Sequence, residues 1–156
     1  MPRPTDLDPA SWHRHFAMEA NNRAWALAEQ ATRSADEARE MLGVAHASAW
    51  HWAAVGTELH RMRATMLLAQ VHALLGDAPR AWEYASRMRA FFLEQPDTPD
   101  WELAFTHAIY ANAAHAAGRA AEHRGAWRQA REALDAIADA EDRAIVEKTF
   151  AQVPRP

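Results

Sequence analysis

A chain of 156 residues is long enough for one domain with a buried core, and abundant Ala, Leu, Glu and Arg favour helices over sheets. Its formal net charge of −4, with Lys148 as the only lysine, argues against a nucleic-acid or membrane-surface partner. The absence of Cys excludes disulfides and thiolate chemistry, and the lack of a signal peptide or a long apolar run predicts a cytoplasmic protein.

The first helix signals follow a short N-terminal tail, residues 1–8, which we expect to be flexible. Asp8 and Pro9 form a favourable N-cap and first-turn pair and predict a helix that runs to about Arg33. The segment 34–37, Ser-Ala-Asp-Glu, has the spacing of a capping box and predicts a second helix that ends near Gly56. The expected buried face of this helix carries Ala38, Leu42, Ala45, Ala49 and Trp52.

The middle of the chain contains two helical segments joined by a Gly-Asp turn. Thr57 is the predicted cap of a third helix, which ends at Gly76. Asp77 is then the predicted cap of a fourth helix, in which apolar residues recur at helical spacing. This stripe consists of Ala81, Ala85, Met88 and Phe92.

The clearest break in the chain is the segment 95–99, Gln-Pro-Asp-Thr-Pro. It predicts a fifth helix that starts at Thr98 and ends at Gly118. A sixth helix is expected at about 120–138, and Asp139 is the predicted cap of a short seventh helix.

The turns inside these helix pairs recur at a fixed interval, because Ser34, Gly76 and Gly118 are evenly spaced along the chain. Such regularity is typical of stacked helical hairpins, in which each pair buries its face on the next. We therefore predict an all-α fold of about seven helices, in which antiparallel hairpins stack as a short α-solenoid. The expected single domain, 9–153, consists of hairpins at about 9–56, 57–95 and 98–138 and a capping helix at 139–153.

The central hairpin has a large–small pair before its turn and an alanine after it. These features are Leu68-Ala69, Gly76-Asp77 and Ala81, and they resemble the tetratricopeptide repeat (TPR). The hairpin after it matches with Tyr110-Ala111, Gly118 and Trp127, and the one before it with Leu27-Ala28 and Ala38. The resemblance spans roughly 9–138, but the interval from Gly76 to Gly118 exceeds the family period of about 34 residues, so longer helices are expected.

The resemblance implies that the first helix of each pair lines a concave groove. Two amides of that row, Gln70 and Asn112, are separated by the same interval as the turns and would occupy equivalent points. Amides with one Arg and two aromatic rings suit a peptide or a small polar ligand, whereas the alternative is an ordinary solvated helix face. The row consists of Asn22, Trp25, Glu29, Arg63, Met66, Gln70, Phe105, Asn112 and His115. A family variant grips a partner's C-terminal carboxylate with Lys and Asn residues of the groove. The row here has no lysine, and although Arg63 could bind a carboxylate, the full clamp is missing and this activity is not expected.

The chain has nine His, but their spacing does not predict a metal site or a cofactor. His46 and His51 are five residues apart and His13 and His15 two apart, so neither pair shares a helical face well. The sequence also lacks a His-Glu-x-x-His motif and a Gly-rich phosphate loop. Four His among apolar neighbours, His46, His51, His72 and His107, are expected to be interior residues that folding could still bring together.

Two functions remain open. The preferred one is a non-catalytic TPR-like interaction module that binds a protein or peptide segment, or itself, through the concave helix face. The alternative is a small-molecule-binding protein or an enzyme, with a cavity between the helices lined by His72, His107, Trp25 and Arg63. Trp50 and Trp52 are two residues apart and cannot both face inward, so one is expected at the surface, which makes a homodimer a candidate assembly.

Overall fold

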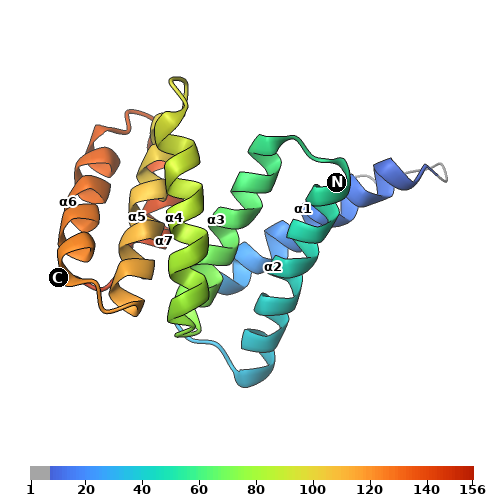
Figure 1. Ribbon diagram of the computed structural model, residues 1–156, viewed down its shortest axis with the longest axis horizontal. Helices are drawn as coiled ribbons and strands as arrows, with labels where there is room; N and C mark the ends of the chain where they lie inside the picture. The colour runs from blue at the N-terminus through green and yellow to red at the C-terminus, as the bar shows by residue number, and fades with distance from the viewer. Residues whose placement is uncertain (1–7) are drawn as a thin grey trace.

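The computed structural model describes residues 8–156, and this part of the chain forms seven α-helices and no β-strand (Figure 1). The helices are α1 Pro9–Ala28, α2 Ala35–Val55, α3 Glu58–Leu74, α4 Ala78–Glu94, α5 Asp100–Ala116, α6 Ala120–Ala136 and α7 Ala140–Phe150. The prediction of an all-α fold is confirmed for these residues. The predicted flexible tail lies outside the described residues except for Asp8, which caps α1.

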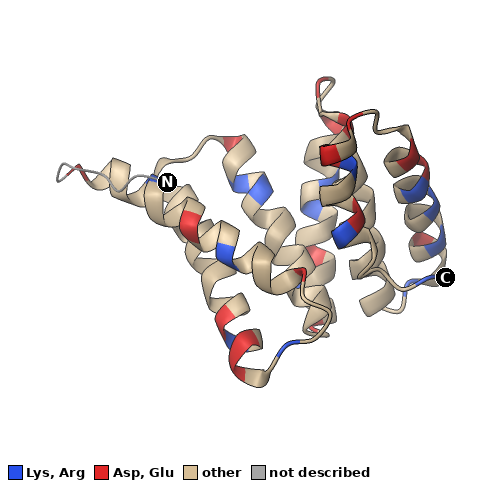
Figure 2. Cartoon of the chain, turned by 180° about the vertical axis from the view of Figure 1, so that it is seen from behind, with Lys and Arg blue, Asp and Glu red and all other residues tan. Residues whose placement is uncertain are grey.

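The helices pack as successive pairs, α1 with α2, α3 with α4 and α5 with α6. The first helices also contact one another in the order α1, α3, α5 and then α7, and they form one layer of the molecule. The second helices α2 and α4 each contact the first helix of the following pair as well. Figure 2 shows the molecule from behind, the side on which α1 and α7 lie. The arrangement is helical repeat-like, with each pair packed on the next.

The second and third helix pairs have helices of the same length at the same relative positions along the chain. Each of the helices α3, α4, α5 and α6 has 17 residues. Both turns place a glycine in the left-handed region, Gly76 at φ 75° and Gly118 at φ 68°, where a side chain would be strained. The backbone N–H of the next residue then donates to a carbonyl five residues back, with distances of 2.9 Å from Asp77 and 2.9 Å from Arg119. The interval from Gly76 to Gly118 therefore corresponds to one structural repeat.

Three predicted helix starts are confirmed by their cap hydrogen bonds. The Glu37 N–H donates to Ser34 Oγ at 3.1 Å while the Ser34 N–H donates to Glu37 Oε2 at 2.7 Å, which completes the capping box. Thr57 forms the same reciprocal arrangement with His60 at the start of α3. Asp139 Oδ1 accepts from two backbone N–H groups at 2.9 Å at the start of α7.

The first helix is shorter than predicted, because α1 ends at Ala28 and not near Arg33. Arg33 folds back over the end of the helix instead of extending it. Its Nη1 donates to the carbonyl oxygens of Leu27, Ala28 and Gln30 at 3.0, 3.3 and 2.9 Å. A cation at the C-terminal end of a helix satisfies free carbonyl groups and favours termination there.

Two other predicted caps differ in detail. Helix α5 begins at Asp100, and the Thr98 hydroxyl donates to the Phe92 carbonyl oxygen at 2.8 Å, so it closes the preceding loop rather than capping α5. Asp77 occupies the N-cap position of α4 but makes no cap hydrogen bond. Its carboxylate accepts from Arg80 Nη1 at 2.9 Å instead.

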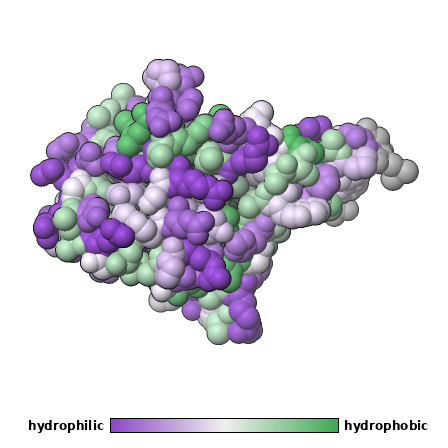
Figure 3. Space-filling model, in the orientation of Figure 1, coloured by the Kyte–Doolittle hydropathy of each residue, from purple (hydrophilic) through white to green (hydrophobic). Residues whose placement is uncertain are grey.

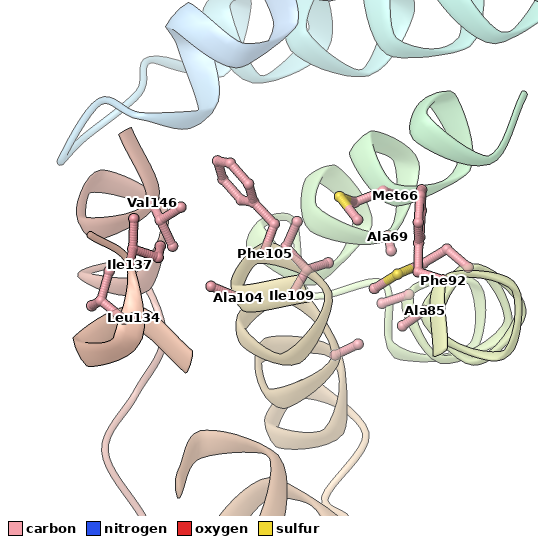
Figure 4. Packing of buried hydrophobic residues seen from close by; sticks show 13 residues of the cluster. Met66, Ala69, Ala85, Phe92, Ala104, Phe105, Ile109, Leu134, Ile137 and Val146 are labelled. Carbon is pink, nitrogen blue, oxygen red and sulfur yellow. The ribbon is translucent and has the colours of Figure 1, made fainter. Parts of the chain in front are cut away.

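The main core consists of residues of α3, α4, α5, α6 with its C-cap, and α7 (Figure 4). The stripe predicted on α4 is confirmed, since Ala81, Ala85, Met88 and Phe92 are all buried. Helix α4 turns this stripe toward α3 and α5, while α3 and α5 are enclosed on several sides and bury residues on most of their surface. Amphipathic periodicity is therefore clear in the outer helices and weak in the inner ones.

The predicted face of α2 is only partly buried. Its fully buried residues are Met41, Ala45 and Ser48, while the predicted Leu42 and Ala49 are partly buried and pack against the same core cluster. The hydroxyl of Ser48 donates to the Ala17 carbonyl oxygen of α1 at 3.0 Å, which explains how a polar residue fits this interface. The close approach of α1 and α2 there favours small residues over larger apolar ones.

One exposed aromatic residue was expected at the end of α2, and the structure confirms it. Trp50 is 65% exposed, whereas Trp52 stacks on His60 with ring centroids 4.3 Å apart. The face seen in Figure 3 is mainly hydrophilic, with separate apolar patches.

Candidate functional site

A cavity of about 300 Å³ lies on the layer formed by the first helices. Its lining residues come from α1 and its C-cap, α3, α5 and α7, and we call this space the central cavity. Five predicted groove residues, Trp25, Glu29, Arg63, Met66 and Phe105, are brought together here. The complete lining consists of Asn21, Trp25, Glu29, Arg63, Met66, Trp101, Glu102, Phe105 and Ile145.

Helical spacing explains how α1 supplies its side of the cavity. Asn21, Trp25 and Glu29 are separated by four residues and therefore share one face of α1 or its C-cap. On α5, Trp101 and Phe105 have the same spacing. The cavity is thus lined by helices that are far apart in sequence but lie side by side in the layer.

Three aromatic rings form the apolar wall of the cavity. Phe105 lies between two tryptophans, with its ring centroid 5.8 Å from Trp25 and 6.2 Å from Trp101. The Trp101 ring is nearly perpendicular to Phe105, at 87°. Phe105 is buried, but Trp25 and Trp101 are half-buried and keep part of their rings accessible. Large, partly accessible aromatic side chains are the residues that most often anchor a bound partner.

A buried ion pair forms the polar wall. Arg63 Nε donates to Glu102 Oε1 at 2.6 Å, and Nη2 donates to Oε2 at 3.1 Å, a bidentate arrangement. The Glu102 side chain is 2% exposed and that of Arg63 41%. A carboxylate with so little exposure to solvent requires its counter-charge, so Arg63 is paired with Glu102 and is not a free cation.

Sequence reasoning missed Glu102. The signal that pointed to it is the repeat interval, because the step from Gly76 to Gly118 aligns Glu102 with His60, in the first turn of α3 just before Arg63. An acidic residue at that point of α5 faces the basic residue of α3 once the two helices are packed side by side.

The two predicted groove amides are not at the surface. Gln70 is 1% exposed and Asn112 is 4% exposed, and Asn112 Nδ2 donates to Gln70 Oε1 at 3.0 Å across a separation of 42 residues. They do occupy equivalent points of successive repeats, but on the sides of α3 and α5 that face each other. Gln70 and Asn112 are therefore not exposed in the groove as expected, because their amides are buried against one another.

A second cavity, of about 260 Å³, continues from the central cavity toward α2 and includes the predicted residue Asn22. Asn21 and Arg63 line both cavities, so the Arg63–Glu102 ion pair lies where the two cavities meet. The remaining lining residues are Met18, Trp52 and His60. A third cavity, of about 180 Å³, continues toward α7 and is lined by Trp101, Phe105, Asp142 and Ile145. We call these three neighbouring spaces, which share lining residues, the concave groove.

Carboxylates gather at the α7 end of the concave groove. Burial, and then the neighbouring carboxylates of Asp139, Asp100 and Glu141, raise the pKa of Asp142 above its usual range. Glu29, on the opposite wall, lies 3.8 Å from Lys148 Nζ, whose side chain is 62% exposed. The groove therefore has an acidic edge, with one solvated lysine beside it.

The residues of the pocket alternative are placed elsewhere. His72 Nδ1–H donates to Asp77 Oδ2 at 3.1 Å, and His72 Nε2 lies 3.3 Å from His46 Nε2. His107 is buried, and burial followed by the charge of Arg89 lowers its pKa. Neither His72 nor His107 lines the central cavity with Trp25 and Arg63. The fold therefore does not form a central cavity lined by all four of these residues.

Two pairs of His bring their ring nitrogens within 3.3 Å of each other on folding, although their sequence spacing gave no sign of it. His13 Nδ1 of α1 lies 2.9 Å from His51 Nδ1 of α2, and His46 of α2 meets His72 of α3. Among residues 8–156, no group of three or more His, Asp or Glu side chains is placed to hold a metal ion. The two contacts are pairwise links between α2 and its two neighbours.

Comparison of the chain with protein-family models, with curated proteins and with solved structures gave no match. Within the described residues, none of the helices combines the length and the apolar character needed to span a bilayer.

Proposed function

We propose that this protein is a non-catalytic, TPR-like interaction module that binds a protein segment in the concave groove. The observation that carries the proposal is the convergence of Trp25, Arg63 and Phe105 from three helices on one cavity. Aromatic and Arg side chains in a partly desolvated pocket are the usual energetic centre of a protein interface. A row of neighbouring cavities along successive first helices suits an extended chain better than a compact ligand.

A selection from a displayed library of random twelve-residue peptides tests this proposal. We expect enriched peptides, and we expect Trp25→Ala to weaken their binding about tenfold or more, as for a central aromatic anchor. Trp50→Ala is the matched control, because Trp50 is 65% exposed and is absent from the lining of the groove. Far-ultraviolet circular dichroism checks that both variants fold. Failure to enrich any peptide, or equal losses in the two variants, would contradict the proposal.

A small-molecule ligand is the second candidate for the same cavity. A volume of about 300 Å³ reaches the lower end of the range seen for small-molecule sites. In that case a metabolite library should raise the melting temperature of the protein, and Trp25→Ala should abolish the rise while no displayed peptide is enriched.

A second copy of this chain is a third candidate partner, as the sequence already suggested. Its basis is the apolar surface near the start of α1 and the end of α2, where Trp50 is 65% and Phe16 43% exposed. Sedimentation velocity over a concentration series tests it, and a dimer that persists in Trp50→Ser would place the contact elsewhere.

A further inference from the structure

We propose that the central cavity takes a cationic side chain, a lysine or an arginine of the bound segment. The inference rests on the proposed function and specifies the chemistry of the partner at one point of the groove. Two features support this inference: the aromatic wall of the cavity and the carboxylates around it.

The aromatic wall is suited to a cation. Trp25 and Trp101 are half-buried on either side of Phe105, with centroid distances of 5.8 and 6.2 Å. A cation within about 6 Å of such rings is attracted by their negative faces, and tryptophan is the most effective ring. An ammonium or guanidinium group in the central cavity would lie among these three rings, since Trp25, Trp101 and Phe105 all line it.

The protein already uses this interaction at the edge of the cavity. The Arg63 guanidinium carbon lies 5.6 Å from the centroid of the Trp101 ring. The charge of Arg63 is balanced by Glu102 through two hydrogen bonds, so the ion pair adds no net positive charge to the cavity. A second cation is therefore not repelled by an unpaired arginine.

The carboxylates around the wall complement a positive charge and oppose a negative one. Glu29 lines the central cavity, and Asp142 lines the adjoining space together with Trp101 and Phe105. The carboxylates of Asp139, Asp100 and Glu141 repel that of Asp142, and a cation beside Asp142 relieves this repulsion. Lys148 is the competing cation, but its side chain is 62% exposed and its 3.8 Å contact is with Glu29.

Small probes of one shape and different charge test the assignment. N-acetyl-lysine methylamide is titrated into the ¹⁵N-labelled full chain, with N-acetyl-norleucine methylamide as the uncharged control and N-acetyl-glutamate methylamide as the anion. We expect the lysine probe to shift the indole N–H resonances of Trp25 and Trp101. We expect it to bind at least threefold more tightly than the norleucine probe, as weak cation–π and charge contributions predict.

Charge variants separate a specific site from the general acidity of the protein. Asp142→Asn should weaken binding of the lysine probe about threefold, whereas Asp135→Asn, an exposed carboxylate on α6, should leave it unchanged. Equal binding of the lysine and norleucine probes, tighter binding of the glutamate probe, or equal effects of the two Asn variants would overturn the proposal.

The outcomes distinguish this inference from the proposed function. If displayed peptides bind through Trp25 but the enriched sequences lack a basic residue and the lysine probe does not bind, only the cation assignment fails. If the lysine probe binds and no displayed peptide is enriched, the cavity accepts a cation but the protein does not bind segments of chain.

Discussion

Asn112 donates a hydrogen bond to Gln70 at 3.0 Å across the contact between α3 and α5, and both side chains are almost completely buried. The two amides occupy equivalent places in successive repeats, so the repeat interval appears in the structure as a direct side-chain bond. This bond links two inner helices at a point where apolar packing surrounds it. It contributes to holding the layer together and is not part of the ligand-facing surface.

Replacing one of these amides should destabilise the fold. We expect Asn112→Leu to lower the free energy of unfolding by about 1–3 kcal/mol, because Gln70 is then a buried amide without this partner. The double variant Gln70→Leu/Asn112→Leu should lose less than the sum of the single losses, since neither amide remains unpaired. Urea denaturation measures all three, and strictly additive losses would argue against a coupled pair.

Breaking the Arg63–Glu102 pair should also destabilise the fold, because it leaves a buried charge without its partner. Arg63→Ala leaves a carboxylate that is 2% exposed without its partner, and we expect a loss of about 1–3 kcal/mol, less than for a fully buried pair because Arg63 is 41% exposed. Arg63→Met/Glu102→Gln should recover most of that loss in urea denaturation. An Arg63→Ala variant as stable as the original chain would show that the pair contributes little.

The His pairs predict a loss of stability in mild acid. Burial, followed by the charge of His13, lowers the pKa of His51; burial also lowers that of His72, against the opposing effect of Asp77 and with added effects of His46 and Arg80. A lowered folded-state pKa means that the neutral form is favoured. The stabilisation is therefore complete above the ordinary His value of about 6.5 and is lost as the pH falls below it.

The contacts explain why protonation would separate the helices. The Asp77 carboxylate can only accept, so neutral His72 carries its proton on Nδ1 and its Nε2 accepts from His46. A second proton on His72 removes that acceptor, and the same applies to His13 and His51.

We expect the urea midpoint to fall between pH 7.5 and pH 5.5, a window above the range in which carboxylates titrate. His51→Gln should reduce this fall, and His115→Gln, an exposed His of α5, serves as the control. An unchanged pH dependence in His51→Gln would contradict the assignment of this loss of stability to the His13–His51 pair.

Two glycine positions should respond in opposite directions to the same change. Gly76 has φ 75°, so Gly76→Ala is expected to cost about 1 kcal/mol of stability. Gly43 lies within α2, and a Cβ added there meets nothing within 4 Å. Gly43→Ala should therefore stabilise the protein by about 0.5–1 kcal/mol through helix propensity. Thermal unfolding of the two variants checks the signs.

The sequence by itself determined the features that depend on a few neighbouring residues. The capping box at Ser34 and Glu37, the N-cap at Asp139 and the helix-ending turns at Gly76 and Gly118 were all predicted and are present. Each depends on hydrogen bonds or backbone sterics within about one helical turn, so the residue types suffice to identify them. The stripe on α4 was equally clear because an outer helix buries only one face.

The tertiary structure alone decided which polar residues face one another and which face solvent. Gln70 was predicted for the groove and is buried on Asn112, while Glu102 was not predicted and pairs with Arg63. The partners are 42 and 39 residues apart, and their meeting depends on the rotation of α3 and α5 about their axes when packed. Because these inner helices bury residues on most sides, their periodicity is too weak to reveal that rotation. Local chemistry thus set the helices and their turns, and packing of the inner layer selected the residues that line the groove.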